Sequence, residues 1–207
     1  MQIHAPHNAR KPRADAARNR ERLLIAAKAV FSAGGANASL EAVARAADVG
    51  IGTLYRHFPT REALFEAVFR REVDQLAELA ERLRNHASPV EALRGWLRSN
   101  LELIATKKGM SAALALTVHG SSELFAESAE RLTKAAAALL DRAAAAGQIR
   151  SDISARDMLR AMVGVSFMLD QPGWHASALR LVDVFVDGLR LPAIGIAARR
   201  AAPPKRR

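Results

Sequence analysis

The stretch SLEAVARAADVGIGTLYRHFPTREALF, residues 39–65, decides the fold of this chain. Ser39 is a good N-cap for a short helix, and Asp48 can adopt the left-handed conformation that a tight turn needs. A second short helix is expected over about residues 51–57, and Pro59 ends it. The apolar residues that can hold both helices against a preceding helix are Leu40, Val43, Ala44, Val49, Leu54 and Phe58. The pattern predicts a helix–turn–helix unit.

Outside this stretch, apolar residues recur at helical spacing, alanine is abundant, and a strand-like alternation is lacking. We therefore predict an all-α fold. Besides the two short helices, helices are expected at about residues 16–33, 61–85, 89–106, 111–118, 122–146, 155–170 and 174–191. Lys107-Lys108-Gly109 is expected to interrupt the chain before residues 111–118. Four regions are predicted: a basic flexible arm (1–17), a helix–turn–helix domain (18–65), a helical bundle (66–194) and a basic flexible tail (195–207).

Positive charge gathers at the two ends of the chain. The net charge is +10, from 31 basic and 21 acidic residues, and residues 1–22 and 195–207 carry +4 and +5 of it. The body between them is therefore almost neutral. Basic ends attract polyanions, which are nucleic acid or an anionic membrane surface, although such tails can also serve only to keep a protein in solution.

Several classes of protein are excluded by composition and motif. The chain has no cysteine, which excludes a disulfide scaffold, a thiolate zinc site and a cysteine nucleophile. No run of about 18 apolar residues offers a transmembrane helix, and residues 1–20 lack the apolar core of a secretory signal. A soluble cytoplasmic protein is therefore expected. Because no Gly-rich phosphate loop, zinc-binding His pair or nucleophile elbow is found, no enzyme, metal or cofactor is expected.

Residues 18–65 resemble the TetR family of one-component transcriptional regulators. The residues that carry the resemblance are Ala44, Ala47, Val49, Gly52, Thr53, Leu54, Tyr55, His57, Phe58, Glu62 and Leu64. The remaining two-thirds of the chain matches this family only in its helical layout. The resemblance implies a homodimeric, sequence-specific DNA-binding regulator, most often a repressor. Such a regulator is released from a palindromic operator when a small-molecule effector binds the C-terminal domain.

The resemblance also implies which residues contact DNA. The second helix of the unit would enter the major groove, which is about 12 Å wide. Thr53 and Tyr55 would bond phosphates, whereas Arg56 and His57 would meet phosphates or base edges. Arg61 resembles the basic phosphate contact that is usual in the family. The full predicted set is Ser39, Gly50, Ile51, Thr53, Tyr55, Arg56, His57 and Arg61.

Three residues depart from the family pattern. Asp48 stands where glycine is usual and brings a negative charge close to DNA. Gly50 replaces a common serine, and Ile51 replaces a residue that is often polar and reads bases. An isoleucine at this position can contact a thymine methyl group. These departures bear on which operator is read, and the arginine-bearing arm before the first helix is expected to add attraction in the minor groove.

The C-terminal bundle is expected to hold the effector and to form the dimer. A bundle rich in small residues and methionine can enclose an apolar cavity. The predicted pocket residues are Trp96, Met110, His119, Phe125, Met162 and Phe167. The last two helices are apolar over a broad arc, which is typical of a two-fold, four-helix interface. The predicted interface residues are Leu159, Val163, Leu181, Val182, Phe185 and Leu189.

Dimerisation would set two recognition helices about 34–36 Å apart, which is one turn of DNA. The alternative to a specific regulator is a structural protein that binds DNA without sequence preference, or a membrane surface, through its basic ends. A weak preference for any one DNA sequence, together with strong salt sensitivity, would favour that alternative.

Overall fold

The computed structural model describes residues 10–34, 38–114, 121–165 and 173–191, and these residues form helices joined by short connections. The helices are α1 (Arg10–Gly34), α2 (Leu40–Ala46), α3 (Ile51–His57), α4 (Arg61–Leu83), α5 (Pro89–Leu114), α6 (Ser121–Ala145), α7 (Ala155–Val165) and α8 (Trp174–Leu189). The predicted all-α fold is confirmed. The expectations for residues 115–120, 166–172 and 192–207, the basic tail among them, concern parts of the chain outside the described residues.

The N-terminal unit is built around a small apolar core. Val43 of α2 and Leu54 of α3 are fully buried against α1. The rings of Phe31 (α1) and Phe65 (α4) lie 4.2 Å apart at their centroids. Complete burial of a side chain of this size contributes about 1.5–3 kcal/mol, so these few contacts fix how α2 and α3 sit on α1.

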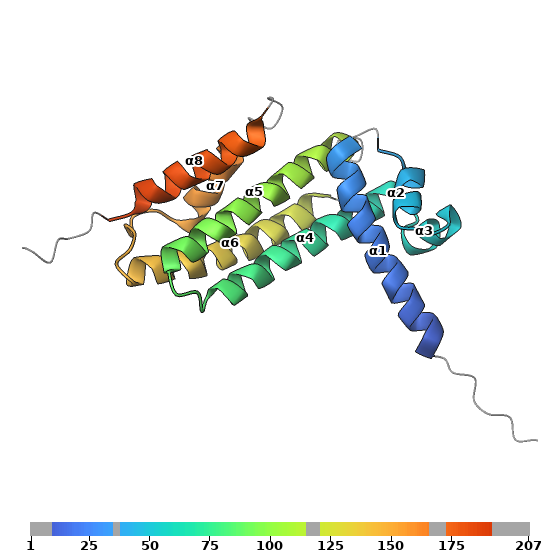
Figure 1. Ribbon diagram of the computed structural model, residues 1–207, viewed down its shortest axis with the longest axis horizontal. Helices are drawn as coiled ribbons and strands as arrows, with labels where there is room; N and C mark the ends of the chain where they lie inside the picture. The colour runs from blue at the N-terminus through green and yellow to red at the C-terminus, as the bar shows by residue number, and fades with distance from the viewer. Residues whose placement is uncertain (1–9, 35–37, 115–120, 166–172, 192–207) are drawn as a thin grey trace, which may run out of the picture.

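Helices α4, α5 and α6 lie side by side and form the bundle, and α1 crosses α4 and α5 at one end of it (Figure 1). Trp96 of α5 is completely buried, and its indole Nε1 donates to the Leu76 carbonyl of α4 at 2.9 Å. Because α4 begins next to α3 and continues through the bundle, one helix links the two units of the chain.

Helices α7 and α8 pack on the bundle away from α2 and α3 (Figure 1). Ala178, Val182 and Val186 of α8 are buried, and α8 lies against α5 and α7. The end of α8 is held by a single β-bridge between Ile149 and Arg190. Within the described ranges no helix is long and apolar enough to cross a bilayer, and no group of acidic and histidine side chains is arranged to hold a metal ion.

Two of the boundaries predicted from sequence are wrong. Helix α1 begins at Arg10, so residues 10–17 are helical where a flexible arm was expected. Pro12 falls in the first turn, where backbone N–H groups have no partner within the helix, and proline is therefore tolerated. Helix α5 runs unbroken through Lys107–Gly109. One glycine costs a helix only about 1 kcal/mol, which the packing of α5 against five other helices outweighs.

Candidate nucleic-acid interface

The turn between α2 and α3 has the geometry that the sequence predicts. Ser39 caps α2, and its hydroxyl oxygen accepts from the Ala42 N–H at 3.1 Å. Asp48 has φ of 52°, which makes it the one described residue other than glycine in the left-handed region. The Val49 N–H donates to the Ala44 carbonyl at 3.0 Å and closes the turn. Helix α3 therefore leaves α2 at a fixed angle.

Helix α3 has one buried side chain and an exposed outer face. Leu54 is fully buried, whereas Tyr55 is 45% exposed and Ile51 is 39% exposed. Gly50, Gly52 and Arg56 are also exposed, and Thr53 and His57 are half-buried. Leu54 anchors this seven-residue helix, and the helix presents Ile51, Tyr55 and Arg56 to solvent. A large apolar and a polar aromatic side chain on an exposed face are typical of a contact surface.

The arginine of this face is oriented along its own helix. The Arg56 Nε donates to the Gly52 carbonyl at 3.1 Å, and its Nη2 donates to the Thr53 Oγ1 at 3.3 Å. Because the Thr53 oxygen accepts from Arg56, its hydroxyl hydrogen can donate outward. Thr53 and Arg56 therefore form one donor group at the start of α3, suited to an anionic oxygen.

Arg61, which the resemblance makes a phosphate contact, has protein partners in this structure. Its guanidinium lies over two rings, 5.4 Å from the Phe31 centroid and 5.1 Å from the Phe65 centroid. Its Nη1 also donates to the Ala38 carbonyl, directly before the Ser39 cap. Half-buried in this way, Arg61 ties α1, α4 and the start of α2 together.

Arg22 is a residue that the sequence reasoning missed. Its Nη2 donates to the Asp48 Oδ2 at 2.9 Å and to the Asp48 carbonyl at 3.2 Å. The negative charge of Asp48, which departs from the family pattern, is thus paired with a cation from α1. The signal in the sequence was the charge of Asp48 itself, but its partner is 26 residues away and no local pattern identifies it. Arg20 lies over the Phe58 ring at 5.4 Å, and Arg45 is exposed on α2, so further cations surround α3.

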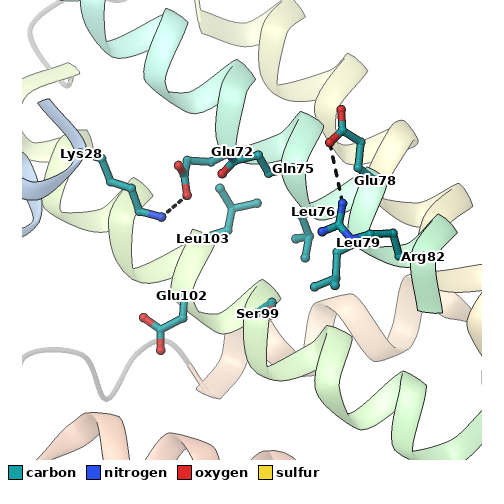
Figure 2. A pocket seen from close by; sticks show the side chains of 10 residues that line it. All are labelled: Lys28, Glu72, Gln75, Leu76, Glu78, Leu79, Arg82, Ser99, Glu102 and Leu103. Atoms are coloured by element: carbon teal, nitrogen blue, oxygen red, sulfur yellow. Dashed lines mark hydrogen bonds and ion pairs between the residues drawn. The ribbon is translucent and has the colours of Figure 1, made fainter. Parts of the chain in front are cut away.

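Three of the six predicted pocket residues have described side chains. Trp96 and Met162 are completely buried, and Phe125 is half-buried with its ring edge-on to Phe69 at 5.2 Å. Nothing is described of the Met110 side chain, and His119 and Phe167 lie outside the described residues. A pocket of about 440 Å³ lies between α1, α4 and α5, and none of the predicted residues lines it (Figure 2).

The predicted interface residues divide into outward and inward sets. Val163 and Leu181 are exposed, at 51% and 39%, and Leu159 and Phe185 are half-buried. Val182 and Leu189 are buried within the subunit, where they pack α8 onto its own neighbours. Val184, which lies on the same apolar helix, is the most exposed large apolar residue described, at 68%. The outer face of α8 therefore runs through Leu181 and Val184.

A network of arginines and carboxylates holds α8 on α5. Arg94 donates to Asp183 at 3.1 Å and also to Asp187, while Arg98 donates to both oxygens of Asp183 at 2.7 Å. Burial works against the charge of Arg94, but its hydrogen bonds to these aspartates and to Glu91 raise its pKa. The hydrogen bond from Arg98 lowers the pKa of Asp183. Both groups are charged at neutral pH.

Both units of the chain are similar to known bacterial regulators. Residues 23–68 match the profile of the bacterial regulatory proteins of the tetR family, and residues 88–191 match the C-terminal domain of SbtR-like transcriptional regulators. The transcriptional repressor KstR of Mycolicibacterium smegmatis is 41% identical over 64 residues, which is 30% of this chain and 31% of that protein. The chain thus matches about a third of the length of that repressor.

Two solved structures match nearly in full. The TetR transcriptional regulator SCO0520 from Streptomyces coelicolor is 43% identical, with a TM-score of 0.71 over 84% of this chain and 99% of that one. A TetR transcription regulatory protein from Mycobacterium vanbaalenii is 32% identical, with a TM-score of 0.70 over 87% and 99%. The same two regulators therefore match both the DNA-binding unit and the C-terminal bundle of this chain.

Proposed function

Because the chain belongs to the TetR family of transcriptional regulators, we propose that it is a homodimeric repressor that leaves a palindromic operator when a small molecule binds its C-terminal helices. Proteins of this family are DNA-binding transcriptional regulators, and residues 23–68 of the chain match their DNA-binding unit.

The observation that carries the proposal is the exposed face of α3. Tyr55 and Ile51 project from a helix that Leu54 anchors, and Thr53 and Arg56 form a donor group at its start. The helix follows a tight turn, as a helix that enters the major groove does. Tyr55 and Thr53 would bond phosphates and set the register, and Ile51 and Arg56 would meet base edges.

The outer face of α8 supports a dimer. Leu181 and Val184 are exposed on a helix whose other side is already packed against α5. A two-fold axis across this face would bring α7 and α8 of two subunits into a four-helix interface. The same axis would relate two copies of α3, so that the preferred DNA site has two inverted halves.

The proposal is tested by footprinting on the DNA that flanks the gene of this protein, followed by fluorescence anisotropy on the protected duplex and a scrambled one. We expect the protected duplex to bind at least about 10³-fold more tightly than the scrambled one at moderate salt. Equal affinity for both, with strong dependence on salt, would support a non-specific DNA-binding protein that acts through its basic ends.

Variants of α3 separate the two kinds of contact. Tyr55→Phe removes one hydrogen bond to a charged group, so affinity should fall about tenfold on every duplex alike. Arg56→Ala should instead change which operator variants are preferred. Arg84→Ala is the matched control, because Arg84 is an exposed arginine at the end of α4 that pairs with Glu81. An equal loss at all operator variants for Arg56→Ala would contradict a base-reading role for Arg56.

A further inference from the structure

The pocket between α1, α4 and α5 adjoins the joint between the DNA-binding unit and the bundle. Its volume of about 440 Å³ lies within the range of small-molecule sites, about 300–1,000 Å³. Leu76, Leu79 and Leu103 supply its apolar surface. Lys28 reaches into it from α1 and bonds Glu72 of α4 (Figure 2). A molecule in this pocket would therefore contact both partners of an ion pair between the two units.

The two partners of this ion pair differ in burial. The Lys28 side chain is 39% exposed, whereas that of Glu72 is only 8% exposed. The second oxygen of Glu72 lies 3.3 Å from the Arg71 Nη1. A buried carboxylate that loses one of its two cations is left only partly compensated, which costs free energy. The Lys28 ammonium, in contrast, can turn into water at little cost. Replacement of Lys28 at Glu72 therefore requires another cation.

The charges around the pocket favour a cation as that replacement. Three carboxylates line it and only two cations do, so their formal sum is negative. Glu78 lies 3.9 Å from Arg82, and Glu102 bonds His175 of α8. A ligand carboxylate would meet these acidic groups and would take Lys28 away from Glu72. A ligand ammonium avoids both costs.

We propose that this pocket binds an amphipathic amine in its protonated form. Its ammonium replaces that of Lys28 on Glu72, and its apolar body covers Leu76, Leu79 and Leu103. Lys28 then points to solvent, and α1 loses one of its ties to α4. The effect on DNA rests on the proposed function, because a looser joint between α1 and α4 no longer holds α3 in one position. Affinity for DNA falls only as far as the amine prefers the loosened state.

The test uses three probes with one apolar body and different head groups: 4-phenylbutylamine, 4-phenylbutanol and 4-phenylbutanoate. Binding of each to the full-length protein is measured by isothermal titration calorimetry. The amine should bind at least tenfold more tightly than the alcohol or the acid. Glu72→Gln should weaken the amine at least tenfold and leave the alcohol unchanged. Lys28→Met should instead tighten the amine, because Glu72 is then without its competitor.

If the pocket binds the amine at Glu72, replacing Glu72 weakens amine binding and replacing Lys28 tightens it. If the ion pair only held the two helices together, both replacements would change amine binding in the same direction. Lys134→Met, which breaks an exposed pair with Glu130 on α6, is the matched control and should change nothing. Circular dichroism confirms that each variant is folded. If Glu72→Gln does not fold, comparing the amine affinities of wild type and Lys28→Met still tests the proposal.

The effect on DNA is measured separately, by anisotropy on the footprinted duplex. The amine should lower the operator affinity of wild type at least fivefold and that of Lys28→Met by less than twofold, since that variant has no tie to release. No amine binding, tighter binding of the acid, or weaker amine binding by Lys28→Met would each overturn the proposal. Those results leave specific DNA binding intact, whereas a failure of specific DNA binding would overturn the proposed function and leave the calorimetry interpretable.

Discussion

Two joints in this molecule are both made with ion pairs, and they differ in kind. Where α1 meets α4, Lys28 makes a bond to one buried carboxylate, and a pocket lies beside it. Where α5 meets α8, Arg94 bonds Glu91, Asp183 and Asp187 together. An ammonium is a compact charge on a flexible stem, whereas a guanidinium is a planar fork with five donors. The difference indicates that the Lys28–Glu72 contact can be released, although Arg61 and the Arg71–Glu21 pair also join α1 to α4, and that the joint between α5 and α8 is fixed.

The largest effect should come from the fixed joint. Arg94 is only 13% exposed, and Arg94→Ala leaves its three carboxylates with fewer partners. We expect a loss of about 2 kcal/mol in the free energy of unfolding, or roughly 6 °C in the melting temperature. Thermal and urea unfolding followed by circular dichroism measure it. Arg180→Ala, on the exposed side of α8 with a bond only to Ser177, should change stability by less than about 0.5 kcal/mol.

The releasable joint should contribute less to stability. Lys28→Met keeps the length of the side chain and leaves Glu72 with Arg71, so we expect a loss of about 1 kcal/mol. Hydrogen exchange should increase along α1 and remain unchanged in α8. The comparison between the joints is wrong if Lys28→Met destabilises the protein more than Arg94→Ala does.

Lowering the pH should weaken the contact between α5 and α8. The loss in the free energy of unfolding should be smaller than for Arg94→Ala, because acid affects only part of the network. Asp183 has a lowered pKa, caused first by the hydrogen bond from Arg98. Its contribution is therefore present above the ordinary pKa of an aspartate, about 4, and is lost as pH falls through the lowered value. Urea unfolding between pH 7 and pH 3 should show this loss in wild type. Asp183→Asn should make the acid end of the profile shallower, and an unchanged profile would show that Asp183 does not contribute.

The smallest effect on stability is expected at an exposed ion pair. Arg22 and Asp48 are both well exposed, so Arg22→Gln should change stability by less than about 0.5 kcal/mol. DNA affinity should nevertheless fall severalfold, because the Asp48 carboxylate then stands without its cation at the turn. Anisotropy at two salt concentrations measures this, with Arg84→Gln, which breaks an exposed pair with Glu81 at the end of α4, as the control. Full affinity in Arg22→Gln would show that Asp48 lies away from the DNA.

The parts of the fold that local chemistry determines could be predicted from sequence. Capping by Ser39, the left-handed Asp48 and the limits of α3 are set by residues close to one another, and each is confirmed. The start of α1 at Arg10 and the unbroken α5 were missed. In α5, packing between helices overrides a weak local signal.

The candidate site divides in the same way. The exposure of Ile51 and Tyr55 follows from helical spacing around Leu54 and could be foreseen. The partners of Arg22, Arg61 and Lys28 could not, because each pair joins residues between 23 and 44 positions apart. The pocket between α1, α4 and α5 depends on how three helices cross, which no pattern within one helix specifies.

The measurement that tests the account most directly is a half-site spacing series. The central claim is that two copies of α3, related by a two-fold axis, read the two halves of one operator. Insertion of five base pairs between the halves of the footprinted duplex turns one half by about half a helical turn, so that the two copies of α3 no longer meet the same side of the DNA. The account predicts that anisotropy then shows binding no tighter than to a single half. Undiminished affinity for the lengthened duplex would contradict it.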